Sequence, residues 1–370
     1  MKIERVGLAA RRYVLRDTLA TSRTRLAERR GYAIELVDEN GKIGRGEALP
    51  LPAAGTEDLA ASHAALRASG ARLAGREGEL QELLDWVEAH ASRAPAASCG
   101  LDTALHDLEA QRRGQPVAHL LAARPRDSVD VNAVMGSAAS RGPAGEAVAA
   151  VRRGYRTLKL KVGVRSLDAD AALLAAVRAV IPGSTSLRID ANGAWTVESA
   201  LAALETLSEF DVDLVEQPVR GGDLEGLRLV SEQSPVPVAA DEALATSAGR
   251  EALVTGSLVP VAILKPMVLG GLRASARLAR AAAAAGVRCV VTTTFEGPVG
   301  TAAALHLAAA LGDPELAHGL AASDTLVVGF PQELVPVRGS LRVRGEPGLL
   351  GRIRTPATSV LGEAWGGGVR

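Results

Sequence analysis

The chain has 370 residues, of which 47% are hydrophobic, 23% are charged and 2% are aromatic, and 42 basic side chains balance 42 acidic ones. At ~100–200 residues per domain, this length excludes a single small module and predicts two domains, or one large barrel with an appended domain. Zero net charge, without a run of lysine or arginine, excludes the electrostatic footprint by which nucleic-acid-binding proteins neutralise phosphates.

Signals for membrane insertion or secretion are not found in the sequence. The most apolar stretch, 274–285, is interrupted by two arginines and is shorter than the ~20 apolar residues that span a bilayer. The first residues lack the apolar core of a secretory signal, so we expect a cytoplasmic protein. Cys99 and Cys289 lie far apart in segments of different kinds, which predicts neither a disulfide framework nor a CxxC metal site.

The first 125 residues mix strand and helix patterns and predict an α+β domain. Residues 32–37 and 42–44 flank Asn40-Gly41, a dipeptide that supplies the positive φ angles of a tight hairpin turn. Helical patterns follow over 56–74, 77–91 and 101–113, the last of which ends before Gly114 and Pro116.

From residue 126 to about 330, short apolar runs alternate with helical stretches rich in Ala, Leu and Arg. The runs cover residues 129–134, 157–162, 186–191, 212–217, 236–240, 261–265, 288–294 and 316–320. Most successive runs start about 25 residues apart, the length of one strand–helix unit, and buried parallel strands read as continuous apolar runs. These units predict an α/β fold with a (β/α)8 barrel over 126–330. A doubly wound open sheet is the alternative, but no GxGxxG or GxxxxGK(S/T) phosphate loop follows any run. We expect residues 331–370 to return to the first domain.

Three acidic side chains end three consecutive runs. Asp190, Glu216 and Asp241 follow one another at intervals of 26 and 25 residues, so each has the same position in its strand–helix unit. Active sites of such barrels lie at the C-terminal ends of the strands, and adjacent strands are ~4.8 Å apart, which lets the three carboxylates converge. Like charges at such distances repel unless a cation lies between them, and oxygen ligands select a hard ion. The pattern predicts a Mg²⁺ site, with Mn²⁺ as the alternative ion.

Lys159 and Lys161 alternate with apolar residues in the second run, so both side chains point to the same side of the strand. A solvent-facing edge strand is the structural alternative, but helices cover the outer face of a barrel strand, so we expect both lysines in the barrel mouth. A second ammonium and a metal ion lower the pKa of a lysine, which makes Lys161 the candidate base. Lys265 ends the sixth run on the opposite wall, so a reacting carbon would have a lysine on each face.

In their order and spacing, these motifs resemble the enolase superfamily, specifically its muconate-lactonizing-type subgroup, over nearly the whole chain. The matching segments are 188–192, 215–218, 240–242 and 264–266 in the barrel, and 44–48 and 101–108 in the first domain. The resemblance implies a modified TIM (β/α)8 barrel with an N-terminal α+β capping domain. It also implies one Mg²⁺ and abstraction of a proton α to a carboxylate.

Within the subgroup, the chain most resembles the o-succinylbenzoate synthases of menaquinone biosynthesis, through residues 19–23, 29–31, 292–296 and 317–320. This resemblance implies a lyase that dehydrates a succinyl-cyclohexadiene carboxylate, with Lys161 as the base and Lys265 stabilising the enolate. On the same site, the alternatives are an N-acylamino acid racemase or dipeptide epimerase, in which both lysines exchange protons with one carbon, and a muconate-type cycloisomerase. Dipeptide epimerases of the subgroup usually carry Asp-x-Asp on the eighth strand, where this chain has Asp324 alone. The non-enzymatic alternative is a silent barrel scaffold, which gains nothing from three crowded carboxylates.

Substrate contacts are predicted at six positions, Thr21, Arg23, Asn192, Thr294, Glu296 and Gly300. Gly300 lies near the start of a predicted helix, whose N–H groups could hold a substrate carboxylate. The expected partner is a small-molecule carboxylate, and a homo-oligomer is compatible with the sequence. His306 is expected in the packed core, whereas the roles of Glu242, His318 and Asp324 stay open.

Overall fold

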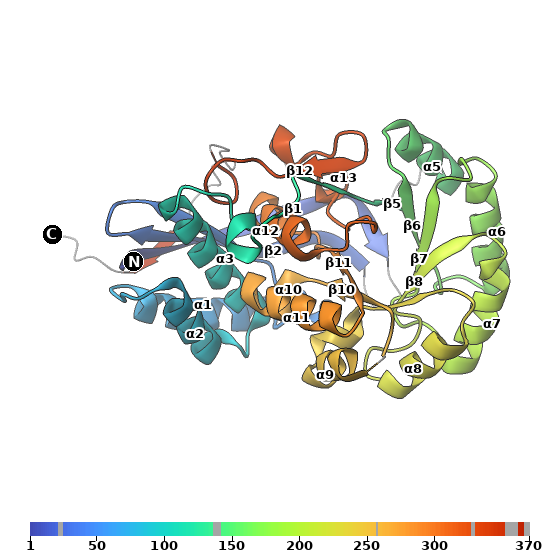
Figure 1. Ribbon diagram of the computed structural model, residues 1–370, viewed down its shortest axis with the longest axis horizontal. Helices are drawn as coiled ribbons and strands as arrows, with labels where there is room; N and C mark the ends of the chain where they lie inside the picture. Colours follow the sequence, from blue (N-terminus) through green and yellow to red (C-terminus); the bar gives the residue numbers. More distant parts are fainter. Residues whose placement is uncertain (21–24, 136–141, 257, 327–329, 352–361, 366–370) are drawn as a thin grey trace.

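An antiparallel sheet flanked by helices occupies one end of the molecule, and a curled parallel sheet with its helices occupies the other (Figure 1). The computed structural model describes residues 1–20, 25–135, 142–256, 258–326, 330–351 and 362–365. The architecture is the expected modified TIM barrel with an N-terminal α+β capping domain.

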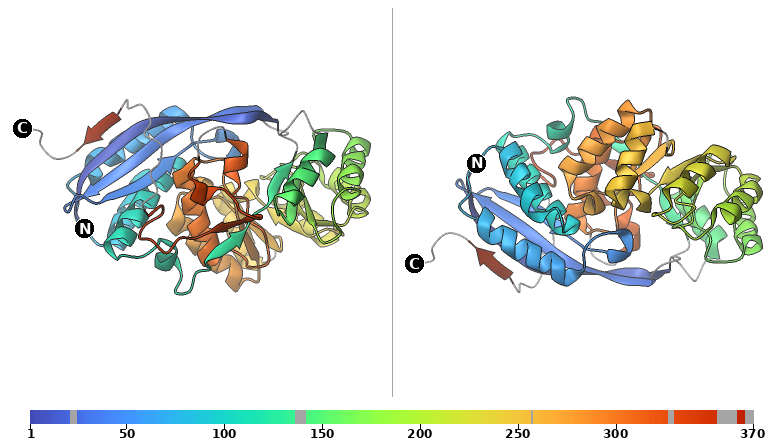
Figure 2. Two further views of the ribbon diagram at one scale, coloured as in Figure 1. Left: turned by 90° about the horizontal axis from the view of Figure 1, so that it is seen from above. Right: turned by 90° about the horizontal axis from the view of Figure 1, so that it is seen from below.

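The capping domain contains a four-stranded antiparallel sheet in the order β13-β1-β2-β3. Its strands are β1 (Ile3–Ala20), β2 (Arg25–Asp38), β3 (Ile43–Ala48) and β13 (Gly362–Trp365). The predicted hairpin is confirmed, because Val37 of β2 pairs with Ile43 of β3 across the Asn-Gly turn. The helical elements are η1 (Pro52–Ala54), α1 (Leu59–Leu73), α2 (Leu80–Ala91), α3 (Pro95–Arg112) and the single-turn α4 (Ala118–Leu121). Figure 2 shows β1 and β2 as a long ribbon that reaches from this domain toward the barrel.

The Gly-x-Gly-Glu segment of β3 has a physical explanation. A Cβ atom on Gly46 would lie 1.8 Å from the carbonyl oxygen of Gly100, and one on Gly44 would lie 2.2 Å from that of Ala104. Both carbonyls belong to α3, so β3 and α3 pack backbone against backbone only because these two residues lack side chains. Successive strand side chains point to opposite faces, which directs Glu47 away from α3.

Seven parallel strands form the curled sheet of the barrel in the order β11-β10-β9-β8-β7-β6-β5. Their bounds are β5 (Ala133–Met135), β6 (Thr157–Lys161), β7 (Ser186–Asp190), β8 (Val212–Glu216), β9 (Val238–Ala240), β10 (Val261–Leu264) and β11 (Arg288–Val291). The eighth predicted run forms two isolated parallel bridges rather than a strand: His318 pairs with Val131, and Gly319 pairs with Thr292. These bridges connect the two edges of the curled sheet.

Helices follow the barrel strands and cover their outer face, as Figure 1 shows for α5 to α8. Ser166, Thr196 and Asp223 each accept a hydrogen bond from a first-turn N–H group and so begin α6, α7 and α8. The helical elements of this half are α5 (Gly142–Arg152), α6 (Leu167–Arg178), α7 (Val197–Ser208), α8 (Leu224–Gln233), η2 (Glu242–Ala245), α9 (Ser247–Gly256), α10 (Pro266–Leu269), α11 (Leu272–Ala284), α12 (Pro298–Leu311) and α13 (Ala322–Thr325).

The first predicted barrel run, 129–134, is divided between two sheets. Its start belongs to β4 (Ser128–Asp130), which pairs antiparallel with β12 (Ser340–Arg342) after the short η3 (Gln332–Leu334). Only its end enters the barrel, as β5. The sequence does not show where the chain leaves one sheet and enters another, because both parts of this run contain buried apolar residues.

Cys99 and Cys289 are both buried and free, so they form no disulfide. Among the residues whose placement is described, no helix combines the length and apolar character needed to cross a membrane.

Candidate active site

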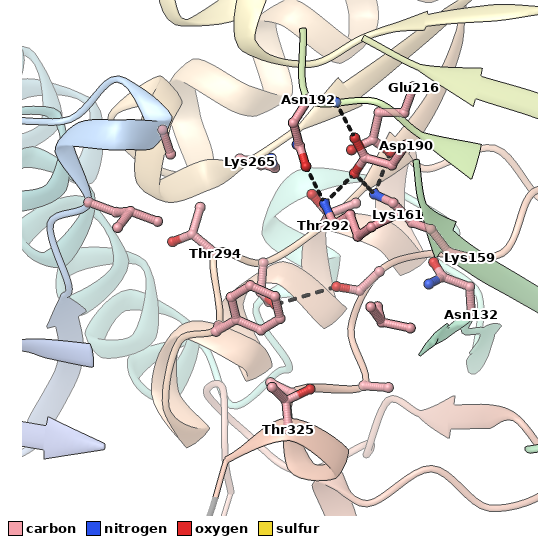
Figure 3. A pocket seen from close by; sticks show the side chains of 18 of the residues that line it. Asn132, Lys159, Lys161, Asp190, Asn192, Glu216, Lys265, Thr292, Thr294 and Thr325 are labelled. Carbon is pink, nitrogen blue, oxygen red and sulfur yellow. Dashed lines mark hydrogen bonds and ion pairs between the residues drawn. The ribbon is translucent and has the colours of Figure 1, made fainter. Parts of the chain in front are cut away.

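A pocket opens at the C-terminal ends of the parallel strands, where Figure 3 shows lysine, carboxylate, amide and threonine side chains gathered around one space. Its walls come from the barrel and from the loop after β3 of the capping domain. The lining residues are Leu51, Ala53, Ala54, Asn132, Val134, Lys159, Lys161, Asp190, Asn192, Glu216, Glu242, Lys265, Thr292, Thr293, Thr294, Phe295, Gly319, Ala321, Ala322 and Thr325.

The three predicted metal ligands stand at the ends of neighbouring strands. Asp190 and Glu216 are the last residues of β7 and β8 and pair directly in the sheet, and Asp241 follows β9. Their exposed fractions are 1%, 5% and 5%, so all three carboxyl groups are removed from bulk water. Buried acids at one edge of a sheet need cationic partners.

Three lysines supply those partners (Figure 3). Lys159 Nζ lies 2.7 Å from a carboxylate oxygen of Asp190 and 2.7 Å from one of Glu216. Lys161 Nζ donates to Asp190 Oδ2 at 2.6 Å, and Lys265 Nζ donates to Asp241 Oδ2. The lysines predicted to enter the barrel mouth therefore meet the carboxylates there.

Burial and charge act against each other on these groups. Burial raises the pKa of Glu216 to about 7, and the negative charge of Asp190 acts in the same direction. Burial also raises the pKa of Asp241, against the opposing effect of Lys265. Burial opposes ionisation of Asp190, but Lys159 and Lys161 hold its pKa below the usual range. Burial lowers the pKa values of Lys159 and Lys265, but the neighbouring carboxylates outweigh it, so both pKa values are raised.

The carboxylates suit a hard divalent cation. Glu216 Oε1 is buried and accepts no hydrogen bond from the residues that the structure describes, so one carboxylate oxygen is available to a ligand. Within the described part of the chain, no three His, Cys, Asp or Glu side chains stand close enough together to enclose a metal. Each of the three acids is instead paired with a lysine. Oxygen donors without His or Cys fit Mg²⁺.

The remaining predicted residues divide between the pocket and the structure behind it. Asn192 and Thr294 line the pocket, whereas Glu296 and Gly300 are not among its lining residues. Glu296 accepts hydrogen bonds from the N–H and hydroxyl groups of Thr294, and the N–H of Gly300 donates to Glu47 Oε2 at 3.0 Å. The start of α12 is therefore occupied by a carboxylate of the capping domain. Thr21 and Arg23 lie outside the described residues.

Two buried side chains of the capping domain hold this region from behind. Arg29 donates to the carbonyl oxygen of Thr294 at 2.9 Å and to those of Leu49 and Pro50, so it joins the loop after β3 to the pocket wall. Tyr13 donates its hydroxyl to Glu47. Arg29 belongs to segment 29–31, on which the family resemblance partly rests, but its hydrogen-bond partners are too distant in the chain to be predicted from the sequence.

The residues whose roles the sequence left open have hydrogen-bond partners in the structure. Asp324 accepts hydrogen bonds from Arg153 at 3.0 Å and from the Tyr155 hydroxyl at 2.6 Å, which directs it away from the pocket. His318 Nδ1 accepts the N–H of Val291, and burial lowers the pKa of His318 to about 3. His306 is buried as expected; it accepts the N–H of Ala118 and contacts the carbonyl oxygen of Leu349. Glu242 lines the pocket and accepts from Asn192.

Several pocket residues were not predicted from the sequence. Asn132 lies inside the predicted run 129–134, just before β5, whereas Thr292 and Thr293 lie inside the predicted run 288–294 and directly follow β11. A rule that included hydroxyls directly after the barrel strands would have found the two threonines, but not Asn132. Leu51 lies in the loop before η1, and Thr325 ends the single-turn α13; neither segment is long enough for the sequence to carry a periodic signal for side-chain direction.

Replacing Glu47 with glutamine is expected to change how stability depends on pH. Burial raises the pKa of Glu47 from 4.5 to about 7, so its contribution to stability is complete below pH 4.5 and is lost as the pH rises through 7. This difference in pKa corresponds to about 3 kcal/mol. Urea unfolding from pH 5 to 8 should show wild type losing stability relative to Glu47→Gln, whereas the exposed-site control Glu35→Gln should follow wild type. Parallel profiles for wild type and Glu47→Gln would contradict the assignment.

Comparison with known proteins places these features in context. Residues 6–122 match the family described as mandelate racemase / muconate lactonizing enzyme, N-terminal domain, and residues 144–355 match the one described as enolase C-terminal domain-like. The hydrophobic dipeptide epimerase of Enterococcus faecalis is 30% identical over 352 residues, 94% of this chain and 96% of that protein. Muconate cycloisomerase 1 of Rhodococcus opacus is 34% identical over 277 residues, 73% of each chain. A crystal structure of dipeptide epimerase from E. faecalis V583, complexed with Mg and the dipeptide L-Leu-L-Tyr, has a TM-score of 0.87 at 29% identity, covering 94% of this chain and 99% of that one.

Proposed function

The chain belongs to the enolase superfamily, in its muconate-lactonizing-type subgroup, and on that basis we propose a Mg²⁺-dependent epimerase or racemase that acts on N-acylated amino acids, of which dipeptides are one case. One observation carries the proposal. Lys161 ends β6 and Lys265 follows β10, while β7, β8 and β9 lie between these two strands and carry the three carboxylates. A substrate carbon above the carboxylates has a lysine on each side.

Asp190, Glu216 and Asp241 are the residues that would hold Mg²⁺. When bound there, the ion would neutralise a substrate carboxylate, make its α-proton more acidic and compete with the lysines for the acidic side chains. The unpartnered Glu216 Oε1 and the all-oxygen donor set support this assignment.

The two lysines account for inversion at the α-carbon. Lys161, as the amine, takes the α-proton on one face, and the C–H electron pair remains on the substrate as an enolate. Lys265, as the ammonium, then delivers a proton to the opposite face. One C–H bond breaks and one forms, the first lysine ends protonated and the second deprotonated, and proton exchange with solvent restores both. The reverse reaction exchanges their roles.

The pocket wall away from the lysines and carboxylates suits a substrate that has an acylated nitrogen and an apolar side chain. Leu51, Val134 and Phe295 line it, and the eighth barrel position and the segment after it contribute Gly319, Ala321 and Ala322. Asp324, the nearest acid in that segment, is already bonded to Arg153 and Tyr155. The described lining residues thus include no carboxylate on this wall to pair with a substrate ammonium.

Dehydration of a succinyl-cyclohexadiene carboxylate is the second candidate. The same wall favours it, because that substrate has no ammonium group to neutralise. The relatives reported above support the epimerase more than this lyase, and the cycloisomerase relative supports a third use of the same enolate chemistry.

Incubation of the enzyme with Mg²⁺ in D₂O distinguishes these candidates. With N-succinyl amino acids and hydrophobic dipeptides, the epimerase should give α-deuterated product of inverted configuration, seen by NMR and chiral chromatography. The lyase should instead form the aromatic product from the cyclohexadiene substrate and show little α-exchange with N-acyl amino acids. Dehydration without inversion of any N-acyl substrate would overturn the epimerase proposal.

A further inference from the structure

Lys161, the base on one side of the site, is held by two different kinds of acceptor. Its Nζ donates to the carboxylate of Asp190 at 2.6 Å and to the amide oxygen of Asn192 at 2.8 Å (Figure 3). A carboxylate stabilises the charged ammonium. An amide oxygen is neutral and accepts from the amine as well as from the ammonium, because both forms of lysine keep N–H donors. Asn192 can therefore hold Lys161 in place through the whole proton-transfer cycle.

The amide of Asn192 is useful only in one orientation. If its NH₂ group faced Lys161, donor would meet donor and the contact would be lost. Asn192 is 9% exposed, and its backbone has a φ of 47°, in the left-handed region that few residues except glycine and asparagine adopt. Its own N–H donates to Asp190 Oδ1 at 3.0 Å. The backbone is thus fixed, but the amide could still rotate.

Glu242 selects the orientation. Asn192 Nδ2 donates to Glu242 Oε1 at 3.2 Å, and a carboxylate can only accept, so the NH₂ group must face Glu242 and the oxygen must face Lys161. Glu242 begins η2, directly after Asp241, 50 residues from Asn192 in the chain. Lys265 is held differently, since its Nζ donates to the carboxylate of Asp241. The negative charge of Glu242 acts on Lys265 as well, but the hydrogen-bonded relay through Asn192 leads to Lys161.

We propose that Glu242 is a positioning residue for Lys161: by fixing the amide of Asn192, it holds the Lys161 amine on one face of the substrate. Glu242 touches neither substrate nor reacting atoms in this role. The expected effect on proton exchange rests on the proposed function. The contacts of Asn192 with Lys161 and Glu242 can be tested without turnover.

The test compares Glu242→Leu, which removes the acceptor, with Glu242→Gln, whose amide oxygen can still accept from Asn192. The exposed Glu225→Leu on α8 is the matched control. With an enantiomeric pair of N-succinyl amino acids in D₂O, Lys161→Ala and Lys265→Ala first assign which enantiomer loses its α-proton to which lysine. Glu242→Leu should then slow α-exchange of the Lys161-dependent enantiomer at least tenfold and that of the Lys265-dependent one less than twofold. Glu242→Gln should keep both rates near wild type.

Equal slowing of both enantiomers by Glu242→Leu would assign Glu242 a general structural or metal-site role and overturn the proposal. The proposal would also be overturned if Glu242→Leu left the α-exchange rates of both enantiomers unchanged. A neutron crystal structure of Glu242→Leu, which distinguishes an amide oxygen from a deuterated NH₂ group, gives an independent test: the amide of Asn192 should rotate and its oxygen should no longer face Lys161. If wild type exchanged neither enantiomer, the proposed function would fail, and an unmoved Asn192 amide in that crystal structure would overturn the relay separately.

Discussion

Lys161→Ala is expected to lose epimerisation of N-acylated amino acids by about 10²–10⁴-fold or more, the usual loss when a general base is removed. Lys265→Ala should lose inversion to a similar extent, because inversion needs a lysine on each face. Each variant should still exchange the α-proton of the one enantiomer that its remaining lysine serves. Chiral chromatography measures inversion, and NMR in D₂O measures exchange.

Lys42→Ala is the control, because Lys42 is exposed on the capping-domain hairpin and its Nζ donates to the backbone carbonyl of Gln111, away from the pocket. It should match wild type in both assays. Near-wild-type inversion by either pocket-lysine variant would contradict the two-base assignment. If each variant lost exchange of both enantiomers, the result would indicate a collapsed site rather than two separate bases. A melting temperature equal to that of wild type would exclude such a collapse.

Glu216→Gln is expected to abolish the stabilisation of the fold by Mg²⁺ and, with it, activity. The substitution keeps the shape of the side chain but removes the charge of a buried carboxylate that has one unpartnered oxygen. A ligand at 100 times its Kd stabilises the folded state by about 2.7 kcal/mol, so wild type should melt several degrees higher in Mg²⁺ than in EDTA. Differential scanning fluorimetry in the two buffers should show no such difference for Glu216→Gln.

Glu225→Gln provides the comparison for this experiment, since Glu225 is an exposed carboxylate on α8 paired with Arg228. It should keep the full response to Mg²⁺. A wild-type melting curve that is indifferent to both Mg²⁺ and EDTA would contradict the assignment of Asp190, Glu216 and Asp241 as metal ligands. Isothermal titration with Mg²⁺ gives the same comparison without heating the protein.

The strand–helix repeat and the strand-end position of the acids and lysines were accessible from the sequence. Asp190 and Glu216 end β7 and β8, and Lys161 ends β6, because a repeat of nearly constant length returns the chain to the same edge of the sheet each time. Buried strands also require continuous apolar runs, so a charged residue at the end of such a run is conspicuous. Local chemistry likewise determined the Asn-Gly hairpin.

Contacts between distant loops were decided only by the tertiary structure. Gly300 was expected to face substrate, yet its N–H group is taken by Glu47, 253 residues earlier in the chain. Glu242 had no assigned role until Asn192 was found beside it. The eighth run became two bridges, and the first was shared between two sheets. Periodicity specifies which face of a regular element is buried, but a loop has no period, and the direction of its side chains follows from whatever packs against it.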